Sequence, residues 1–389
     1  MMLNDIPITI HPSIDMQIQF KHTVLALMMA GAAFFASCES KTEIPTMQIM
    51  VTKGAIVLNS GDVYNTIDGS ITYIDFTTEQ AQQNVFKYAN GMSLGGSPDD
   101  VIVYDDKIYV AGSDENAVFV LNAKNFKLIQ TISTTEQMGE PEGNCPKRLC
   151  AYDGKVYFST RGGYVGVIDT QTLSIVNKYQ VGPSPEGIAV GMTGETPFLY
   201  VANSDEGLGQ GSISVVNLLS GSASEWTNDR IAYPMDLFLA NDGMYVLDGG
   251  VLDGNMEMEN TGIYRAALDG SNVTKVAKDA RVMSAVGYNI LYYHKSKDGD
   301  SGYSVLDTRG GHTSDFSFQG DASSPIAQPG AMAIDPNTGY ILLASSPEGY
   351  DVDTPCHVNL YTGDGQFVKS YPAGVCPKRI VFLYRSYDD

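Results

Sequence analysis

The stretch CPKRLCAYDGKVYFST, residues 145–160, decides the fold because its pattern returns along the whole chain. It opens with a proline, continues as alternating apolar and polar residues, turns at Asp153-Gly154 and runs into a second alternating segment. This period of two predicts strands, and Asp-Gly between two such segments predicts a hairpin. Related segments begin at Ser97, Ser184, Tyr233, Ala280, Gln328 and Cys376.

The openings recur at a nearly constant interval. Successive openings are separated by as few as 39 residues (Pro146 to Pro185) and as many as 49 (Pro185 to Pro234). In the segment that lacks a proline, we assign Arg281 to the equivalent place. Each unit then continues with a second pair of strand-like runs, such as AVFVLNAKNFKLIQTI (117–132). Two hairpins in about 40–50 residues make one four-stranded antiparallel blade of a β-propeller.

The two ends of the chain supply one further blade. Residues 375–385 contain only the first strand of a unit, whereas residues 55–88 contain the other three, with NVFKY (84–88) as the outermost. The sequence therefore predicts an all-β, seven-bladed propeller, residues 50–389, whose first blade is completed by the C-terminal strand. Pairing the two ends leaves no open sheet edge.

Composition excludes some classes of partner. The chain has 389 residues, with 24 Lys+Arg against 45 Asp+Glu and a formal net charge of −21. Such a protein repels phosphate backbones, and no run of Lys and Arg overrides the charge, so we expect no nucleic-acid partner. A hydrophobic content of 43% is typical of a globular chain.

The first 37 residues have the character of a signal peptide, with Met16 as the expected natural start. The apolar run 23–35 is shorter than the roughly 20 residues of a membrane-spanning helix. It ends at Ala36-Ser37-Cys38, which resembles a bacterial lipobox and predicts lipidation of Cys38, followed by a polar tether over residues 38–49. The alternative is an ordinary cleaved signal. The lipid would be the only membrane contact and would hold the protein at the outer membrane, on its surface or periplasmic face.

The runs GKVYFSTRGGYVGVIDTQTLSIVNKYQVGPSPEGIAV and FLYVANSDEGLGQGSISVVN resemble the repeats of YVTN-type, YncE-like surface-layer propellers. Nearly the whole chain after the signal is similar to surface lipoproteins of that kind. The best-understood of these capture corrinoids beside a TonB-dependent cobalamin transporter. The resemblance thus implies a cobalamin or other corrinoid ligand and an outer-membrane transporter as partner.

Enzyme signatures are missing from the sequence. There is no G-x-S-x-G, H-E-x-x-H, Walker-type or C-x-x-C motif, so we expect a binding protein without a cofactor or metal. Acidic residues at 248–259 could bind Ca²⁺, but they match no calcium loop, and we expect none. Two alternatives stay open: an adhesion-type interaction module of a surface layer, and a propeller enzyme such as a lactonase, lyase or quinoprotein.

Charged residues follow several of the opening prolines. Innermost strands surround the channel of a propeller, so these residues should meet at one mouth of it. Clustered charges of both signs suit a ligand with phosphate, carboxylate or amide groups. The alternative is a ring of ion pairs that only closes the channel. The predicted ligand-binding residues here are Asp100, Lys147, Arg148, Asp236, Lys378 and Arg379.

Loops between the second and third strands should open on the same side. Loop positions carry function more often than buried ones, so their polar and aromatic residues complete the predicted ligand site. These are Arg161, Tyr164, Asn203, Asp248, His294 and Tyr350. Cys356 and Cys376 should also lie on this side, in neighbouring blades, and are the candidates for a disulfide across the closure.

Overall fold

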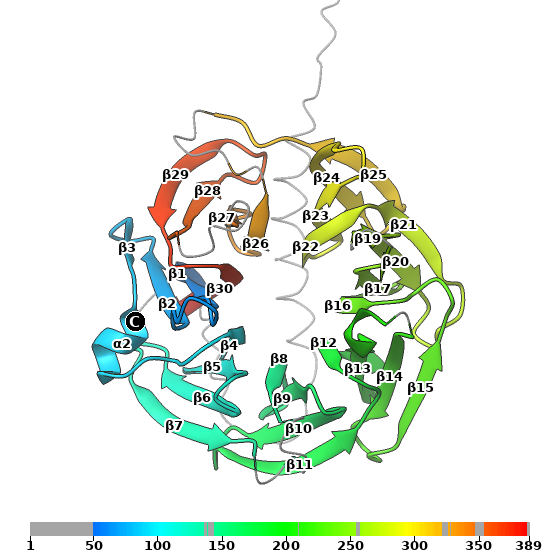
Figure 1. Cartoon of the computed structure of the whole chain (residues 1–389), viewed down its shortest axis with the longest axis horizontal. Coiled ribbons are helices and arrows are strands. Elements are labelled where there is room, and N and C mark those ends of the chain that lie inside the picture. Colours follow the sequence, from blue (N-terminus) through cyan, green and yellow to red (C-terminus); the bar gives the residue numbers. More distant parts are fainter. Residues whose placement is uncertain are drawn as a thin grey trace, which may run out of the picture.

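The chain folds as a ring of seven four-stranded antiparallel sheets, seen in a computed structural model that describes residues 50–135, 138, 144–208, 210–253, 257–320, 326, 328–346 and 354–386 (Figure 1). The predicted seven-bladed propeller is confirmed. From the channel outward, the second to fourth blades are β4 (Pro98–Tyr104), β5 (Lys107–Gly112), β6 (Ala117–Asn122) and β7 (Leu128–Ser133); β8 (Pro146–Tyr152), β9 (Lys155–Thr160), β10 (Tyr164–Asp169) and β11 (Ser174–Gln180); and β12 (Pro185–Thr193), β13 (Thr196–Asn203), β14 (Ser212–Asn217) and β15 (Ala223–Thr227).

The remaining blades repeat this order. They are β16 (Pro234–Ala240), β17 (Gly243–Asp248), β20 (Gly262–Ala266) and β21 (Thr274–Lys278); β22 (Ala280–Val286), β23 (Asn289–Lys295), β24 (Ser301–Asp307) and β25 (His312–Phe316); and β26 (Pro329–Ile334), β27 (Ile341–Ser345), β28 (His357–Tyr361) and β29 (Phe367–Pro372). A small hairpin, β18 (Val251–Leu252) and β19 (Met258–Glu259), extends the β17–β20 loop, and the turn η2 (Asp205–Gly207) follows β13.

The C-terminal strand closes the ring. β30 (Pro377–Ser386) is the innermost strand of the first blade and pairs antiparallel with β1 (Met50–Asn59), which is followed outward by β2 (Ser70–Asp75) and β3 (Gln80–Gln82). The predicted completion of the first blade by the end of the chain is therefore confirmed.

The outer edge of the first blade differs from the prediction. NVFKY does not form a strand; it lies in the helix α2 (Val85–Asn90), and the short β3 takes the outermost place. Asn84 and Gly91 flank the helix in left-handed conformations, which residues of these two types adopt more readily than most. The side chains of Val85 and Phe86 are buried against the first two blades. Packing of this apolar pair fixes the segment, and two apolar residues cannot distinguish a helix from a strand.

The core consists of apolar layers between neighbouring blades. Each layer combines the facing side chains of two adjacent sheets, as where Tyr109 and Val118 of one blade meet Val156 and Phe158 of the next. Within the described residues, no helix is long and apolar enough to cross a membrane.

Candidate functional site

Each innermost strand begins with a β-bulge on the same side of the ring, called here the strand-opening face. The pairing register shifts between Pro98 and Asp100, between Pro146 and Leu149, and at the corresponding place in the other blades. A bulge adds a residue to one strand and re-aims its side chains. In this way residues next to the opening prolines turn toward the channel.

The bulges also correct one part of the predicted alignment. Ala280, rather than Arg281, occupies the proline position, because it pairs with His294 as Pro329 pairs with Ser345. Arg281 is consequently the bulged residue of its strand. Its neighbour Val282 takes the register position of Asp100 and Asp236. The sequence alignment gave this position to Met283 instead.

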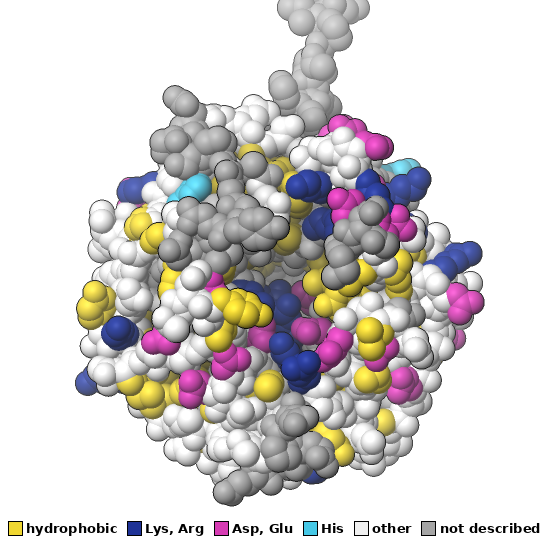
Figure 2. Space-filling view, viewed as in Figure 1, with side chains coloured by type: hydrophobic (Ala, Val, Ile, Leu, Met, Phe, Trp, Pro, Cys, Tyr) yellow, Lys and Arg dark blue, Asp and Glu magenta, His cyan; other side chains and the backbone are white. Residues whose placement is uncertain are grey.

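Eight charged residues meet at the channel mouth. Figure 2 shows cationic and acidic side chains gathered in a hollow at the centre of the strand-opening face, bordered by apolar ones. We call this group the central charge cluster: Asp99, Asp100, Lys147, Arg148, Glu186, Asp236, Lys378 and Arg379. It contains as many cations as acids.

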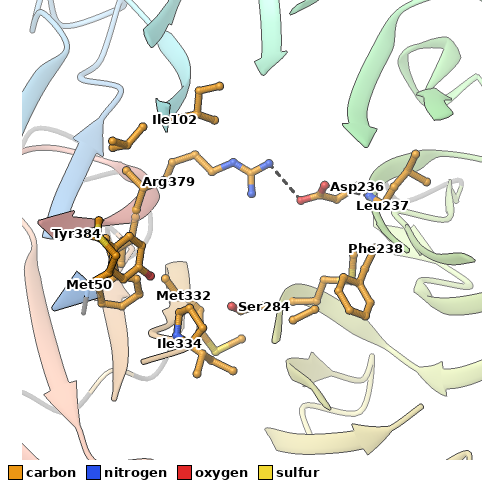
Figure 3. Close-up of a pocket in the computed structure, with 18 of the residues that line it drawn as sticks. Met50, Ile102, Asp236, Leu237, Phe238, Ser284, Met332, Ile334, Arg379 and Tyr384 are labelled. Carbon is orange, nitrogen blue, oxygen red and sulfur yellow. Dashed lines mark hydrogen bonds and ion pairs between the residues drawn. The ribbon is translucent and has the colours of Figure 1, made fainter. Parts of the chain in front are cut away.

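Arg379 is the link that crosses the channel. Its Nε lies 3.0 Å from a carboxylate oxygen of Asp100, and one terminal nitrogen lies 3.1 Å from a carboxylate oxygen of Asp236, in β16. Figure 3 shows the guanidinium reaching from β30 toward Asp236. Burial opposes ionisation of Asp236, but Arg379 and Arg148 outweigh it and hold the pKa of that carboxyl below its usual value. The same attraction raises the pKa of Arg379, against the effect of its own burial.

Asp99 is the second centre of the cluster. Its buried carboxylate accepts from the Lys147 ammonium at 3.0 Å, from the Ser113 hydroxyl at 2.5 Å and from the ammonium of Lys378. Arg148 donates to the main-chain carbonyl of Asp99 at 3.1 Å. A buried carboxylate with this many donors is fixed in position, so the cations around it are fixed as well.

Arg148 has a buried side-chain nitrogen without a hydrogen bond to any described residue. Its Nε lies 3.8 Å from a Glu186 carboxylate oxygen, and this nitrogen makes no hydrogen bond within the described part of the chain. Burial and the neighbouring Arg379 lower the pKa of Arg148. A polar ligand atom at this point would meet an oriented donor whose solvation is already lost.

The structure thus brings together six of the predicted ligand-binding residues: Asp100, Lys147, Arg148, Asp236, Lys378 and Arg379. Arg161 lies beside them on the strand-opening face, where its Nε donates to Glu206 at 2.6 Å. It shares a pocket of about 280 Å³ with Lys147, Glu186 and Tyr233.

Asn203 and Asp248 have a different environment from the one predicted. Both side chains are buried. The Asn203 amide donates to the hydroxyls of Ser212 and Ser214 at 2.9 Å each. The Asp248 carboxylate accepts main-chain N–H bonds from Tyr233 and from two further residues, Ala232 and Gly250. Burial raises the pKa of Asp248. Both residues hold loops of their own blades in place.

Tyr164 and His294 lie away from the cluster. The ring of Tyr164 carries the Lys178 ammonium at 5.2 Å, while His294 packs on Tyr292 with ring centroids 6.0 Å apart. Tyr350, Cys38, and the predicted signal and tether fall outside the described residues.

Sequence reasoning did not place a second pocket on this face. About 470 Å³ in volume, it lies beside the starts of β22 and β26 and is lined by Arg281, Tyr293 and Lys295, among others. Lys297, at the same pocket, pairs with Asp253 at 2.9 Å and with Glu259. In the sequence, this pocket is marked by the one repeat of seven that lacks the opening proline.

No group of three or more His, Cys, Asp or Glu is arranged for a metal ion within the described residues. Cys356 and Cys376 are thiols in the structure. Cys356 exchanges main-chain hydrogen bonds with Ala373 and Gly374, which brings it beside the segment leading to Cys376. Burial, together with the nearby Cys356, raises the pKa of the Cys376 thiol. A bridge between them stays a prediction.

Comparison with known proteins identifies the fold alone. No family model matches the sequence, and no curated protein is similar to it. Among solved structures, a putative 6-phosphogluconolactonase from Bacteroides fragilis superposes with a TM-score of 0.54 at 15% identity, covering 89% of this chain and 100% of that one. Hydrazine synthase of Kuenenia stuttgartiensis has a TM-score of 0.54 at 13% identity (72% and 92% covered). The Pan2 WD40 domain of Neurospora crassa has a TM-score of 0.50 at 8% identity, with 72% of this chain and 80% of that one covered. Propellers of this class include enzymes and interaction modules.

Proposed function

We propose that the protein is a lipid-anchored binding protein of the outer membrane, which captures a corrinoid on its strand-opening face and passes it to a TonB-dependent transporter. The observation that carries the proposal is the pocket formed by Lys147, Arg161, Glu186 and Tyr233 at the edge of the central charge cluster. It supplies fixed donors, acceptors and an aromatic ring at one place.

These groups match the chemistry of a corrinoid. Such a ligand carries carboxamides around a flat macrocycle and a phosphodiester in its nucleotide loop. Lys and Arg suit the phosphodiester, Glu186 can accept from an amide, and the ring of Tyr233 offers a stacking surface. A pocket of about 280 Å³ accepts only part of so large a molecule. The rest would extend over the same face, where the second pocket offers Arg281 and Lys295.

The anchor is compatible with capture on this face. Met50 begins β1 at the end opposite the strand-opening face, since it pairs with Ser386 at the far end of β30. From Cys38 to Met50 the chain can span at most about 40 Å. A lipid on Cys38 would attach the chain from the side opposite the strand-opening face, and the strand-opening face can then point away from the membrane, toward arriving ligand.

Corrinoid binding is tested directly with the chain beginning at residue 39, which retains every strand of the ring. We expect cyanocobalamin to travel with the protein through a desalting column and to titrate with one-to-one stoichiometry. Arg161→Ala should weaken binding at least tenfold. Arg309→Ala is the matched control, because Arg309 also makes an exposed pair at 2.6 Å, with Asp307, in the β24–β25 turn of the opposite face. A colourless protein at tens of micromolar ligand, or equal effects of the two variants, overturns the proposal.

A second candidate, an adhesion-type module that binds a macromolecule, is favoured by one observation. Tyr64, Leu208 and Leu252 are exposed in loops of the strand-opening face, Tyr64 at 99%. Exposed aromatic and aliphatic side chains are typical anchors of protein interfaces. This candidate predicts that Tyr64→Ser abolishes capture of a cell-envelope partner and leaves cyanocobalamin binding unchanged.

A further inference from the structure

The channel behind the central charge cluster is a separate cavity. It has a volume of about 690 Å³ and extends from Arg379 and Asp236 to Met50 and Tyr384, at the face opposite the strand-opening face. Along β30, the five residue steps from Arg379 to Tyr384 correspond to about 17 Å. The Arg379–Asp236 pair lies across its inner end (Figure 3). The cavity is within the size range of small-molecule sites.

The walls of this cavity are mainly apolar. The lining includes Phe238, Met283, Ile334 and Val381, all half-buried and packed in part against the apolar layers between the blades. Met50 and Met332 contribute two further flexible thioethers. Apolar surface in contact with water is unfavourable, and methionine side chains adapt to varied shapes. The walls therefore favour an apolar occupant.

The inner end of the cavity selects against a charged occupant. Each cation of the central charge cluster has an acid to balance it, and Arg379 already bridges Asp100 and Asp236. A carboxylate entering the cavity would compete with Asp236 and leave a net charge in a partly desolvated place, which is costly. A hydroxyl or amide can donate and accept there without changing the charge. The Ser284 side chain points into the same space (Figure 3).

We propose that this channel binds a neutral, largely apolar molecule of up to about 17 Å, with a hydroxyl, carbonyl or amide group directed at the Arg379–Asp236 pair. The molecule enters from the face opposite the strand-opening face. This site is distinct from the proposed corrinoid site, so failure of either proposal leaves the other standing.

The probe is Nile red, a neutral dye that fluoresces in apolar surroundings, added to the chain beginning at residue 39. We expect saturable one-to-one binding, unaffected by cyanocobalamin. 1-Decanol should displace the dye at a concentration at least tenfold below that required of decanoate at pH 8. Ser284→Trp fills the channel and should reduce dye affinity at least tenfold. Val176→Trp, on the outermost strand β11, is the control and should bind normally.

Displacement by decanoate as readily as by 1-decanol would overturn the selection against charge. Dye binding that is unsaturable, or equally reduced in both tryptophan variants, would overturn the site itself. Circular dichroism of each variant shows whether the ring has formed. The alcohol-against-acid comparison uses the unmodified chain, so it decides the proposal even if Ser284→Trp does not fold.

Discussion

The ion pair between Arg379 and Asp236 should couple the first blade to the fifth across the channel. We consider the variants Arg379→Met and Asp236→Asn, alone and together. Methionine keeps much of the apolar stem of arginine, and asparagine keeps the shape of aspartate, so the double-mutant cycle isolates the charge interaction.

The size of the coupling follows from the geometry. At 3.1 Å and an effective dielectric constant of about 20, the Coulomb attraction is about 5 kcal/mol. The two side chains are 28% and 24% exposed, so both have lost most of their hydration, and Arg379 is also repelled by the neighbouring Arg148. These costs offset much of the attraction, and we expect a coupling free energy of about 1.5–3 kcal/mol.

The assay is urea unfolding of the four proteins, followed by circular dichroism and by the fluorescence of Trp226, the single tryptophan. Coincident transitions validate the two-state treatment. The comparison pair is Arg265 and Asp242, 2.8 Å apart but more exposed, for which we expect less than about 1 kcal/mol. A coupling between Arg379 and Asp236 no larger than that of this surface pair would refute the reasoning.

Three further outcomes are expected. The pKa of the Asp236 carboxyl is lowered in the folded protein, so the ionised carboxylate stabilises the fold fully above the unfolded pKa of about 3.9. This stabilisation is lost as the pH falls through the folded-state pKa. In Asp236→Asn, the urea midpoint should therefore fall less steeply between about pH 5 and 2 than it does in the unmodified protein. Phe86→Ala should cost about 3–5 kcal/mol in the same unfolding assay, because the ring is 1% exposed in the core, whereas Tyr88→Ala in the same helix, 81% exposed, should cost less than about 0.5. A chain ending at residue 376 should aggregate on refolding, as judged by light scattering, while one ending at residue 386 should behave as the full chain does.

The architecture of the ring could be predicted because its signal is repeated. One strand of alternating residues is ambiguous, but Pro98, Pro146 and their counterparts recur with the same pattern of strands behind them. The closing strand was predictable for the same reason, since an unmatched first strand at one end of the chain requires three unmatched strands at the other. The helix α2 was not, because it depends on the burial of Phe86 rather than on any periodicity.

The site was predictable only in part. Charges that follow the opening prolines had to share the channel mouth, and residues such as Arg148 and Arg379 do. The bulges that aim them, and the assignment of Ala280 to the proline position, depend on pairing with a second strand. In the sequence, Asn203 and Asp248 have the character of exposed loop residues. In the structure, hydrogen bonds within their own blades occupy both side chains.

The closure of the first blade also determines when the protein can fold. β1 is made among the first strands, but its inner partner β30 is the last, separated from it by nearly the whole chain. Until residues 377–386 have been synthesised, β1 has an unpaired inner edge, and the cation of the Arg379–Asp236 pair does not yet exist. No product that stops before residue 377 can close the ring, so closure of the ring reports that β30 has been made. The six other blades must therefore remain an open ring, with β4 and its neighbours already in place, until β30 pairs with β1.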